Sequence, residues 1–113
     1  MLMTKTFETI SPVDGSVYVG RNFADEKHIT QTLSRTAAAQ KQWRATPLDE
    51  RIKLCQKALQ YFEENAAAIG KEITWQMGRP ISQSPGEVRG VLERANYMIS
   101  IAHDALADRA PPQ

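Results

Sequence analysis

Cys55 is the residue whose type most directly suggests covalent chemistry, because a cysteine thiolate is a strong nucleophile. It lies between Ile52 and Leu59 on an apolar stripe with helical spacing, and no histidine stands one helical turn away to activate it. We therefore predict that Cys55 is a small core residue and not a nucleophile. A single cysteine also excludes an internal disulfide framework and is typical of a reducing compartment.

The two histidines, His28 and His103, are too far apart in the sequence to indicate a metal site, which needs at least three ligands within reach. Both are expected at the surface near helix ends. His103 stands near the end of a predicted helix, where the helix dipole favours a cation. We predict no catalytic role for either residue.

Glycines and tryptophans are the remaining candidates for ligand binding. Gly78, Gly86 and Gly90 do not form the strand-to-helix fingerprint of a phosphate loop, so no dinucleotide site is predicted in this chain. Trp43 and Trp75 are candidate stacking platforms, but we favour core packing at helix ends for both. The sequence therefore predicts no catalytic and no cofactor-binding residue.

Composition restricts the class of protein further. The formal net charge of +1, with both signs mixed, argues against a nucleic-acid partner. No apolar run is long enough to span a membrane, and residues 1–5 are too short and polar for a secretory signal. We expect a soluble, cytoplasmic protein. With three Phe and three Tyr in 113 residues, its own core is expected to be thin.

The elements that carry these residues begin with a β-hairpin over residues 7–20. Its strands are rich in β-branched and aromatic residues, and Pro12–Gly15 is favourable turn sequence. An isolated two-stranded hairpin is marginally stable in water. We therefore expect this one to pack on, or add to, something else.

Helices are predicted for most of the remaining chain. Asp25 caps a first helix over residues 25–44. Thr46 is predicted to cap a second, with Pro47 in its first position. From Leu48 an apolar stripe continues to a stop at Gly78, with a break near Asn65 that divides it into two helices.

The last predicted helix opens with Ser84–Glu87, which reads as a capping box with Pro at the first helical position, and runs to Leu106. The fold class is therefore mostly α with an N-terminal β-hairpin, an α+β arrangement. We divide the chain into an arm and hairpin (1–24), a helical part (25–108) and a terminal loop (109–113).

Several stretches, taken in order, resemble the N-terminal quarter of the NAD(P)-dependent aldehyde dehydrogenases. They are Thr9–Gly15, Gln42–Pro47, Asp49–Arg51, Glu72–Pro80 and Gly86–Val88. The chain departs from the family pattern in two chemically mild ways, with Arg79 where Lys is usual and Ser11 where Asn is usual. The resemblance covers essentially the whole chain.

This resemblance implies a parent enzyme with an α/β, Rossmann-like coenzyme-binding domain, of which residues 25–108 would be a helical part and which is incomplete in this chain. The parent would oxidise an aldehyde to a carboxylic acid with NAD or NADP through a cysteine thiohemiacetal. The present chain is then expected to be an inactive N-terminal fragment that binds no cofactor and serves as scaffold. Its partner is the remainder of the enzyme or another subunit, and the parent is expected to be a homodimer or homotetramer.

The resemblance also implies a monovalent cation site. In some family members, backbone carbonyls near the first hairpin strand and an acidic residue at a helix start hold the ion. The matching positions are Thr9, Ile10 and Glu87. The simpler interpretation, which we favour at this point, is that Glu87 is the capping-box partner of Ser84.

A second hypothesis comes from a different class of function. The chain is then an independent helical interaction module without enzymatic activity, and its apolar stripes are helix-in-groove contacts for a partner. The two hypotheses differ in solution behaviour. A module is expected to be compact and to unfold cooperatively, whereas an incomplete enzyme domain is expected to expose apolar surface.

Overall fold

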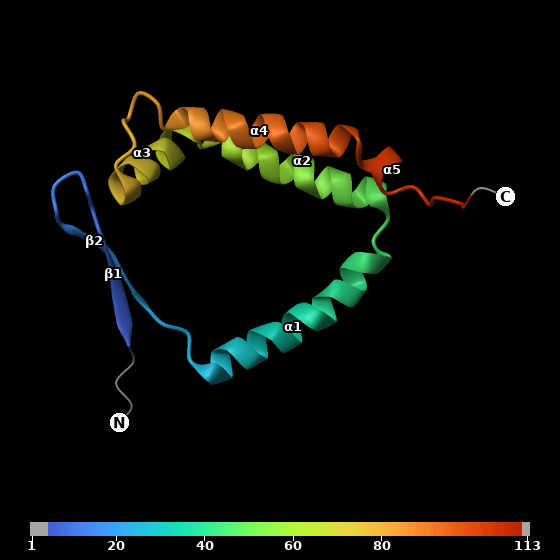
Figure 1. Ribbon diagram of the computed structural model, residues 1–113, viewed down its shortest axis with the longest axis horizontal. Coiled ribbons are helices and arrows are strands. Elements are labelled where there is room, and N and C mark those ends of the chain that lie inside the picture. The colour runs from blue at the N-terminus through green and yellow to red at the C-terminus, as the bar shows by residue number, and fades with distance from the viewer. Residues whose placement is uncertain (1–4, 112–113) are drawn as a thin grey trace.

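A computed structural model describes residues 5–111 and contains a two-stranded hairpin followed by helices (Figure 1). This confirms the predicted mostly helical class with an N-terminal hairpin. The elements are β1 (Thr6–Ile10), β2 (Val17–Asn22), α1 (Glu26–Ala45), α2 (Leu48–Glu64), α3 (Ala66–Met77), α4 (Pro85–Ser100) and α5 (Ala102–Ala105). Among the described residues, no helix has the length and apolarity needed to cross a membrane.

The hairpin forms because Gly15 adopts a positive φ of 77° and closes the turn between β1 and β2. The strands pair antiparallel from Thr6 opposite Asn22 to Ile10 opposite Val17. The register shifts between Thr9 and Ile10, which leaves Tyr18 as an extra residue on β2. Such a bulge redirects side chains. Tyr18 and Val19 are accordingly both half-buried although they are consecutive.

The first helix begins as predicted, because the Asp25 carboxylate accepts a hydrogen bond from the His28 amide at 2.6 Å. The predicted start of α2 is wrong. Thr46 ends α1, and its hydroxyl donates back to the Gln42 carbonyl at 3.1 Å instead of capping α2. Pro47 therefore precedes α2 and does not occupy its first position.

The predicted break at Asn65 is confirmed, since this residue leaves helical geometry and its side-chain amide donates to the Tyr61 carbonyl at 2.8 Å. The predicted stop at Gly78 is also confirmed. Gly78 has a φ of 78°, in the left-handed region, and its amide closes the last turn of α3 on Thr74.

The start of α4 differs from the prediction. Pro85 does occupy its first turn, but Ser84 has helical dihedral angles and makes no side-chain cap hydrogen bond, so the capping box is wrong. The physical reason is that two other partners hold these side chains: the Ser84 hydroxyl lies 2.8 Å from that of Thr74, and Glu87 pairs with Arg79. The last helix also ends earlier than predicted, at Ser100, and Ala102–Ala105 forms a separate short helix.

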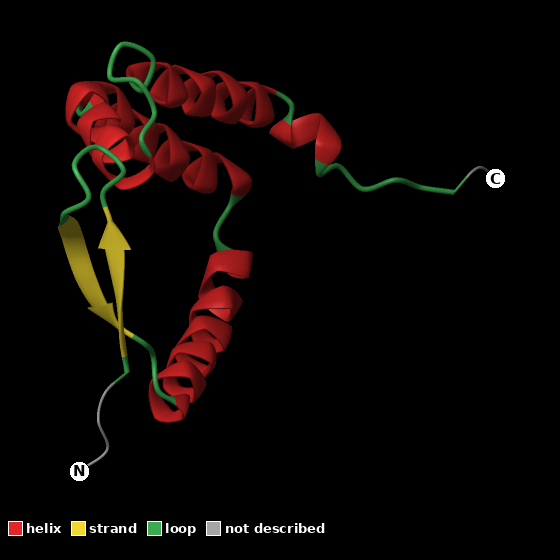
Figure 2. Ribbon diagram, turned by 60° about the vertical axis from the view of Figure 1, so that its left-hand side comes forward, coloured by secondary structure: helices red, strands yellow, loops and turns green. Residues whose placement is uncertain are grey.

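Helices α2, α3 and α4 pack together, whereas α1 stands apart from them in both views (Figures 1 and 2). The contact between α3 and α4 is close at Gly70, where an added Cβ would lie 3.1 Å from the Pro85 ring. None of the residues of α1 is buried. Helices α2, α3 and α4 therefore form one packed group, and α1 lies outside it.

The core of the described chain is small. Val88 is the one buried hydrophobic residue among residues 5–111. The radius of gyration is 19.8 Å, against about 13 Å for a compact domain of this length. The accessible surface is 9764 Å², against about 6,200 Å² for a compact protein of this mass. The prediction of a thin core with uncovered apolar faces is confirmed for this part of the chain.

Candidate functional site

A buried tertiary contact lies where the hairpin turn meets the end of α3. The Ser11 hydroxyl, fully buried, donates to the Trp75 carbonyl at 2.7 Å and thereby satisfies an acceptor that the helix end leaves free. Pro12 lies so close to Gly78 that a Cβ added there would be 2.9 Å from the proline ring. The prediction that the hairpin packs against another part of the protein is confirmed.

Tyr18 provides a second contact between the hairpin and α3. Its ring stacks on Trp75 with centroids 6.0 Å apart and an interplanar angle of 16°, and its hydroxyl donates to Glu72 at 2.7 Å. The hydrogen bond from Tyr18 lowers the pKa of Glu72, with a smaller effect from Gln76. The same hydrogen bond raises the pKa of Tyr18.

Tyr18→Phe should weaken the pH dependence of the free energy of unfolding, both at the acidic pH where Glu72 titrates and at the alkaline pH where Tyr18 titrates. The lowered Glu72 pKa contributes stability above its ordinary value of 4.5, and this is lost as pH falls through the lowered pKa. The raised Tyr18 pKa contributes below its ordinary value of 10.0, and this is lost as pH rises through the raised pKa. Urea unfolding midpoints of the variant and of the unaltered chain, measured from acidic to alkaline pH, test the prediction. Identical profiles for the variant and the unaltered chain would contradict it.

Glu87, a predicted cation ligand, pairs with Arg79 through an ion pair of 2.8 Å. Both side chains are partly exposed, so the pair itself contributes little stability. The other predicted ligands, Thr9 and Ile10, lie at the end of β1, where the register shifts. Within residues 5–111 no three His, Cys, Asp or Glu side chains gather around a point where a metal ion would bind. That observation does not bear on carbonyl ligands, and the cation site stays a prediction.

Cys55 is exposed, so its prediction as a core residue is wrong for the described chain. The reason is that the face of α2 that carries it is not covered by another element. His28 and His103 are exposed, as predicted, and His103 lies 2.8 Å from an Asp49 carboxylate oxygen, which ties α5 to the start of α2.

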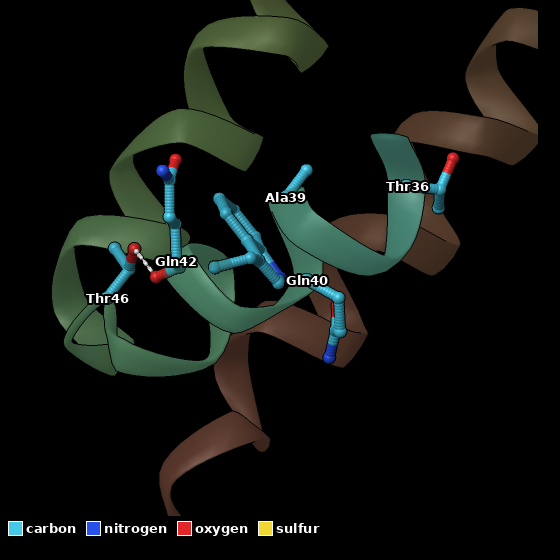
Figure 3. A pocket seen from close by; sticks show the side chains of 6 residues that line it. Thr36, Ala39, Gln40, Gln42 and Thr46 are labelled. Carbon is cyan, nitrogen blue, oxygen red and sulfur yellow. Dashed lines mark hydrogen bonds between the residues drawn. The ribbon is translucent and has the colours of Figure 1, made fainter. Parts of the chain in front are cut away.

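Trp43 is 40% exposed, so core packing is wrong for this residue, whereas Trp75 is half-buried against Tyr18. Trp43 helps to line a shallow surface hollow at the C-terminal end of α1 (Figure 3). The other residues that line it are Thr36, Ala39, Gln40, Gln42 and Thr46. None of these side chains ionises or acts as a strong nucleophile, so the hollow offers no catalytic group.

Two pairings at this end of the molecule were not predicted, namely Tyr18 with Glu72 and Arg79 with Glu87. Tyr18 and Glu72 are 54 residues apart in the sequence, so no local pattern joins them. Arg79 and Glu87 lie on either side of a loop whose course depends on Ser84. These contacts hold the hairpin, α3 and the start of α4 together, and within residues 5–111 they bring no nucleophile, base and orienting group together.

Comparison with known proteins identifies the family of the chain. Residues 2–113 match the family model described as "Aldehyde dehydrogenase family". The chain belongs to the aldehyde dehydrogenase family. No solved structure matches it.

Individual relatives give the same class. The chain is 25% identical to an N-succinylglutamate 5-semialdehyde dehydrogenase of Acinetobacter baylyi, over 88% of this chain and 20% of the relative. It is 25% identical to a succinate-semialdehyde dehydrogenase [NADP(+)] of Deinococcus radiodurans, over 82% of this chain and 20% of the relative. It is 27% identical to a D-glyceraldehyde dehydrogenase (NADP(+)) of Thermoplasma acidophilum, over 82% of this chain and 19% of the relative. The chain thus spans about a fifth of the length of the curated relatives it matches.

Proposed function

We propose that this chain is the N-terminal scaffold of an NAD(P)-dependent dehydrogenase that oxidises an aldehyde to a carboxylic acid. The observation that carries the proposal is the family match over residues 2–113, together with relatives whose names specify aldehyde or semialdehyde oxidation. The rest of the polypeptide, or another subunit, supplies the catalytic groups and the remainder of the α/β, Rossmann-like coenzyme domain. The complete enzyme is a cytoplasmic homodimer or homotetramer in this proposal.

The chemistry proposed for the complete enzyme begins with attack of a cysteine thiolate on the aldehyde carbonyl, which forms a thiohemiacetal. The nicotinamide accepts the hydride, and a base-activated water hydrolyses the resulting thioester. The residues described here neither hold the coenzyme nor take part in these steps. They form the hairpin and the helices, and the apolar faces of these elements would lie against the rest of the coenzyme domain.

The uncovered apolar side chains support this role, because monomeric proteins rarely expose contiguous apolar surface without a partner for it. Ile29 and Leu33 are 49% and 66% exposed on one face of α1. Met77, at the end of α3, is 70% exposed. An independent interaction module would also need exposed contacts, but it would not require the family match that extends over nearly the whole chain.

The chain by itself should form no NADH or NADPH from propanal, because it lacks the catalytic groups of the complete enzyme in this proposal. The assay incubates purified chain with propanal and either coenzyme and follows absorbance of the reduced nicotinamide. Cys55→Ser serves as the control, since Cys55 is the single cysteine. Coenzyme reduction that disappears in Cys55→Ser would overturn the assignment of this chain as scaffold.

A monovalent cation held by the Thr9 and Ile10 carbonyls and the Glu87 carboxylate is part of the proposal for the complete enzyme. Hard cations favour these oxygen ligands. The Glu87 carboxylate must then share its charge between the ion and Arg79. A crystal structure in rubidium salt should show an anomalous peak beside Glu87, and Glu87→Gln should remove it. A map without a peak there would end the proposal for this site.

A further inference from the structure

The last turn of α3 contacts the hairpin on one side and the start of α4 on the other. On the hairpin side, the Trp75 carbonyl accepts the Ser11 hydroxyl at 2.7 Å. On the α4 side, the Thr74 hydroxyl lies 2.8 Å from the Ser84 hydroxyl. Thr74 and Trp75 are consecutive residues of one helical turn, so a displacement of either moves the other.

Both serines that hold this turn are fully buried. The Ser84 hydroxyl also lies 3.3 Å from the Arg79 carbonyl and 3.2 Å from the Pro80 carbonyl, so it organises the loop between α3 and α4. A buried hydroxyl that loses its partners has no water to replace them, which makes its loss costly. Each serine therefore favours one position of the turn.

The backbone around the turn is also closely fitted. Gly78 ends α3 against Pro12 of the hairpin, and Gly70 faces Pro85 of α4. Proline rings are stiff and do not rotate away from a contact. The turn therefore cannot shift toward the hairpin or toward α4 without disturbing a close contact.

We propose that the last turn of α3 couples the position of the hairpin to the position of the α4 start, so that loosening one contact loosens the other. The coupling is reciprocal, as any thermodynamic linkage between two contacts must be. This inference does not rest on the proposed dehydrogenase function. In the folded chain it sets the end of β1, with Thr9 and Ile10, relative to Glu87 in the first turn of α4.

The experiment measures amide hydrogen exchange, residue by residue, in the full chain and in Ser11→Ala and Ser84→Ala. In Ser11→Ala, the Gly86 and Glu87 amides, which donate to the carbonyls of Gln83 and Ser84 just before α4, should exchange about tenfold faster. In Ser84→Ala, the Gly15 amide, which bonds to the Ser11 carbonyl in the hairpin turn, should exchange faster by a similar factor. Amides in the middle of α2 should keep their rates.

Ser16→Ala is the matched control. Within residues 5–111 the Ser16 hydroxyl bonds only to Asp14, at 2.7 Å, and both residues lie in the hairpin turn. It should leave the α4 amides unchanged. If Ser11→Ala changes the hairpin amides but not those of Gly86 and Glu87, the proposal is overturned. Hairpin amides that exchange at the rate of an unstructured peptide in the unaltered chain would also overturn it.

Ser11→Ala has a second outcome, loss of the whole fold, which faster exchange in α2 would reveal. Tyr18→Phe then decides the question, because it removes one exposed hydrogen bond to Glu72 and keeps the ring on Trp75. We expect exchange about twofold faster at Gly86 and Glu87 in this variant. Unchanged rates at both amides would overturn the coupling.

Discussion

Gly78→Ala should destabilise the chain by about 3 kcal/mol, the largest effect expected of any single methyl group added here. Gly78 has a φ of 78°, a conformation that costs an L-residue about 1 kcal/mol or more. The new Cβ would also lie 2.9 Å from the Pro12 ring, which must move and take the hairpin turn with it. Urea unfolding followed by tryptophan fluorescence measures the loss, because Trp75 lies in this contact.

Gly15→Ala is the matched control for this prediction. Gly15 has nearly the same dihedral angle, 77°, but no atom lies within 4 Å of an added Cβ. Only the conformational cost applies, so we expect a loss of about 1 kcal/mol. The difference between the two variants isolates the contact between α3 and the hairpin. Equal losses would contradict the close approach of Pro12 to Gly78.

The isolated chain should bind the dye ANS strongly and remain extended in solution. Its radius of gyration is 19.8 Å, against about 13 Å for a compact domain of this length, and large apolar side chains lie exposed along α1, α3 and α4. Exposed apolar surface of this extent binds ANS and favours association. Small-angle scattering and ANS fluorescence, both measured at several chain concentrations, test the expectation.

The matched variant for this measurement is Leu33→Gln, which removes an apolar side chain that is 66% exposed on α1. It should reduce ANS binding without loss of helix content, because Leu33 has little packing to lose. A monomer with a radius near 13 Å and no ANS binding would favour the independent interaction module instead. The same result would remove the structural support for an uncovered scaffold.

Local sequence signals located most of the secondary structure correctly. Asp25, Asn65 and Gly78 mark helix boundaries through interactions with residues at most four positions away, which a pattern search detects. Two of the errors fall at Thr46 and Ser84, whose types are equally suited to several partners. The Thr46 hydroxyl bonds backward into α1, and the Ser84 hydroxyl bonds to Thr74 across the loop. The type of a capping residue indicates that a helix end is near, but it does not determine which of several groups its hydroxyl bonds to.

Burial was the other quantity that local pattern could not decide. Cys55 and Trp43 have the residue types and positions of core side chains, yet both are exposed because no described element lies over them. An apolar stripe states that a helix face is suited to burial. Whether something covers the face depends on the surrounding structure.

The sequence by itself determined the hairpin, the helices, the turn at Gly15, the helix stop at Gly78 and the resemblance to aldehyde dehydrogenases, since these depend on residue types and spacings. Only the tertiary structure decided that Ser11, Tyr18 and Pro12 meet the end of α3, and that Glu87 pairs with Arg79. The physical reason is distance along the chain. The Tyr18–Glu72 and Ser11–Trp75 hydrogen bonds join residues that are 54 and 64 positions apart along the chain. They require the hairpin to pack against α3, and no local preference encodes them.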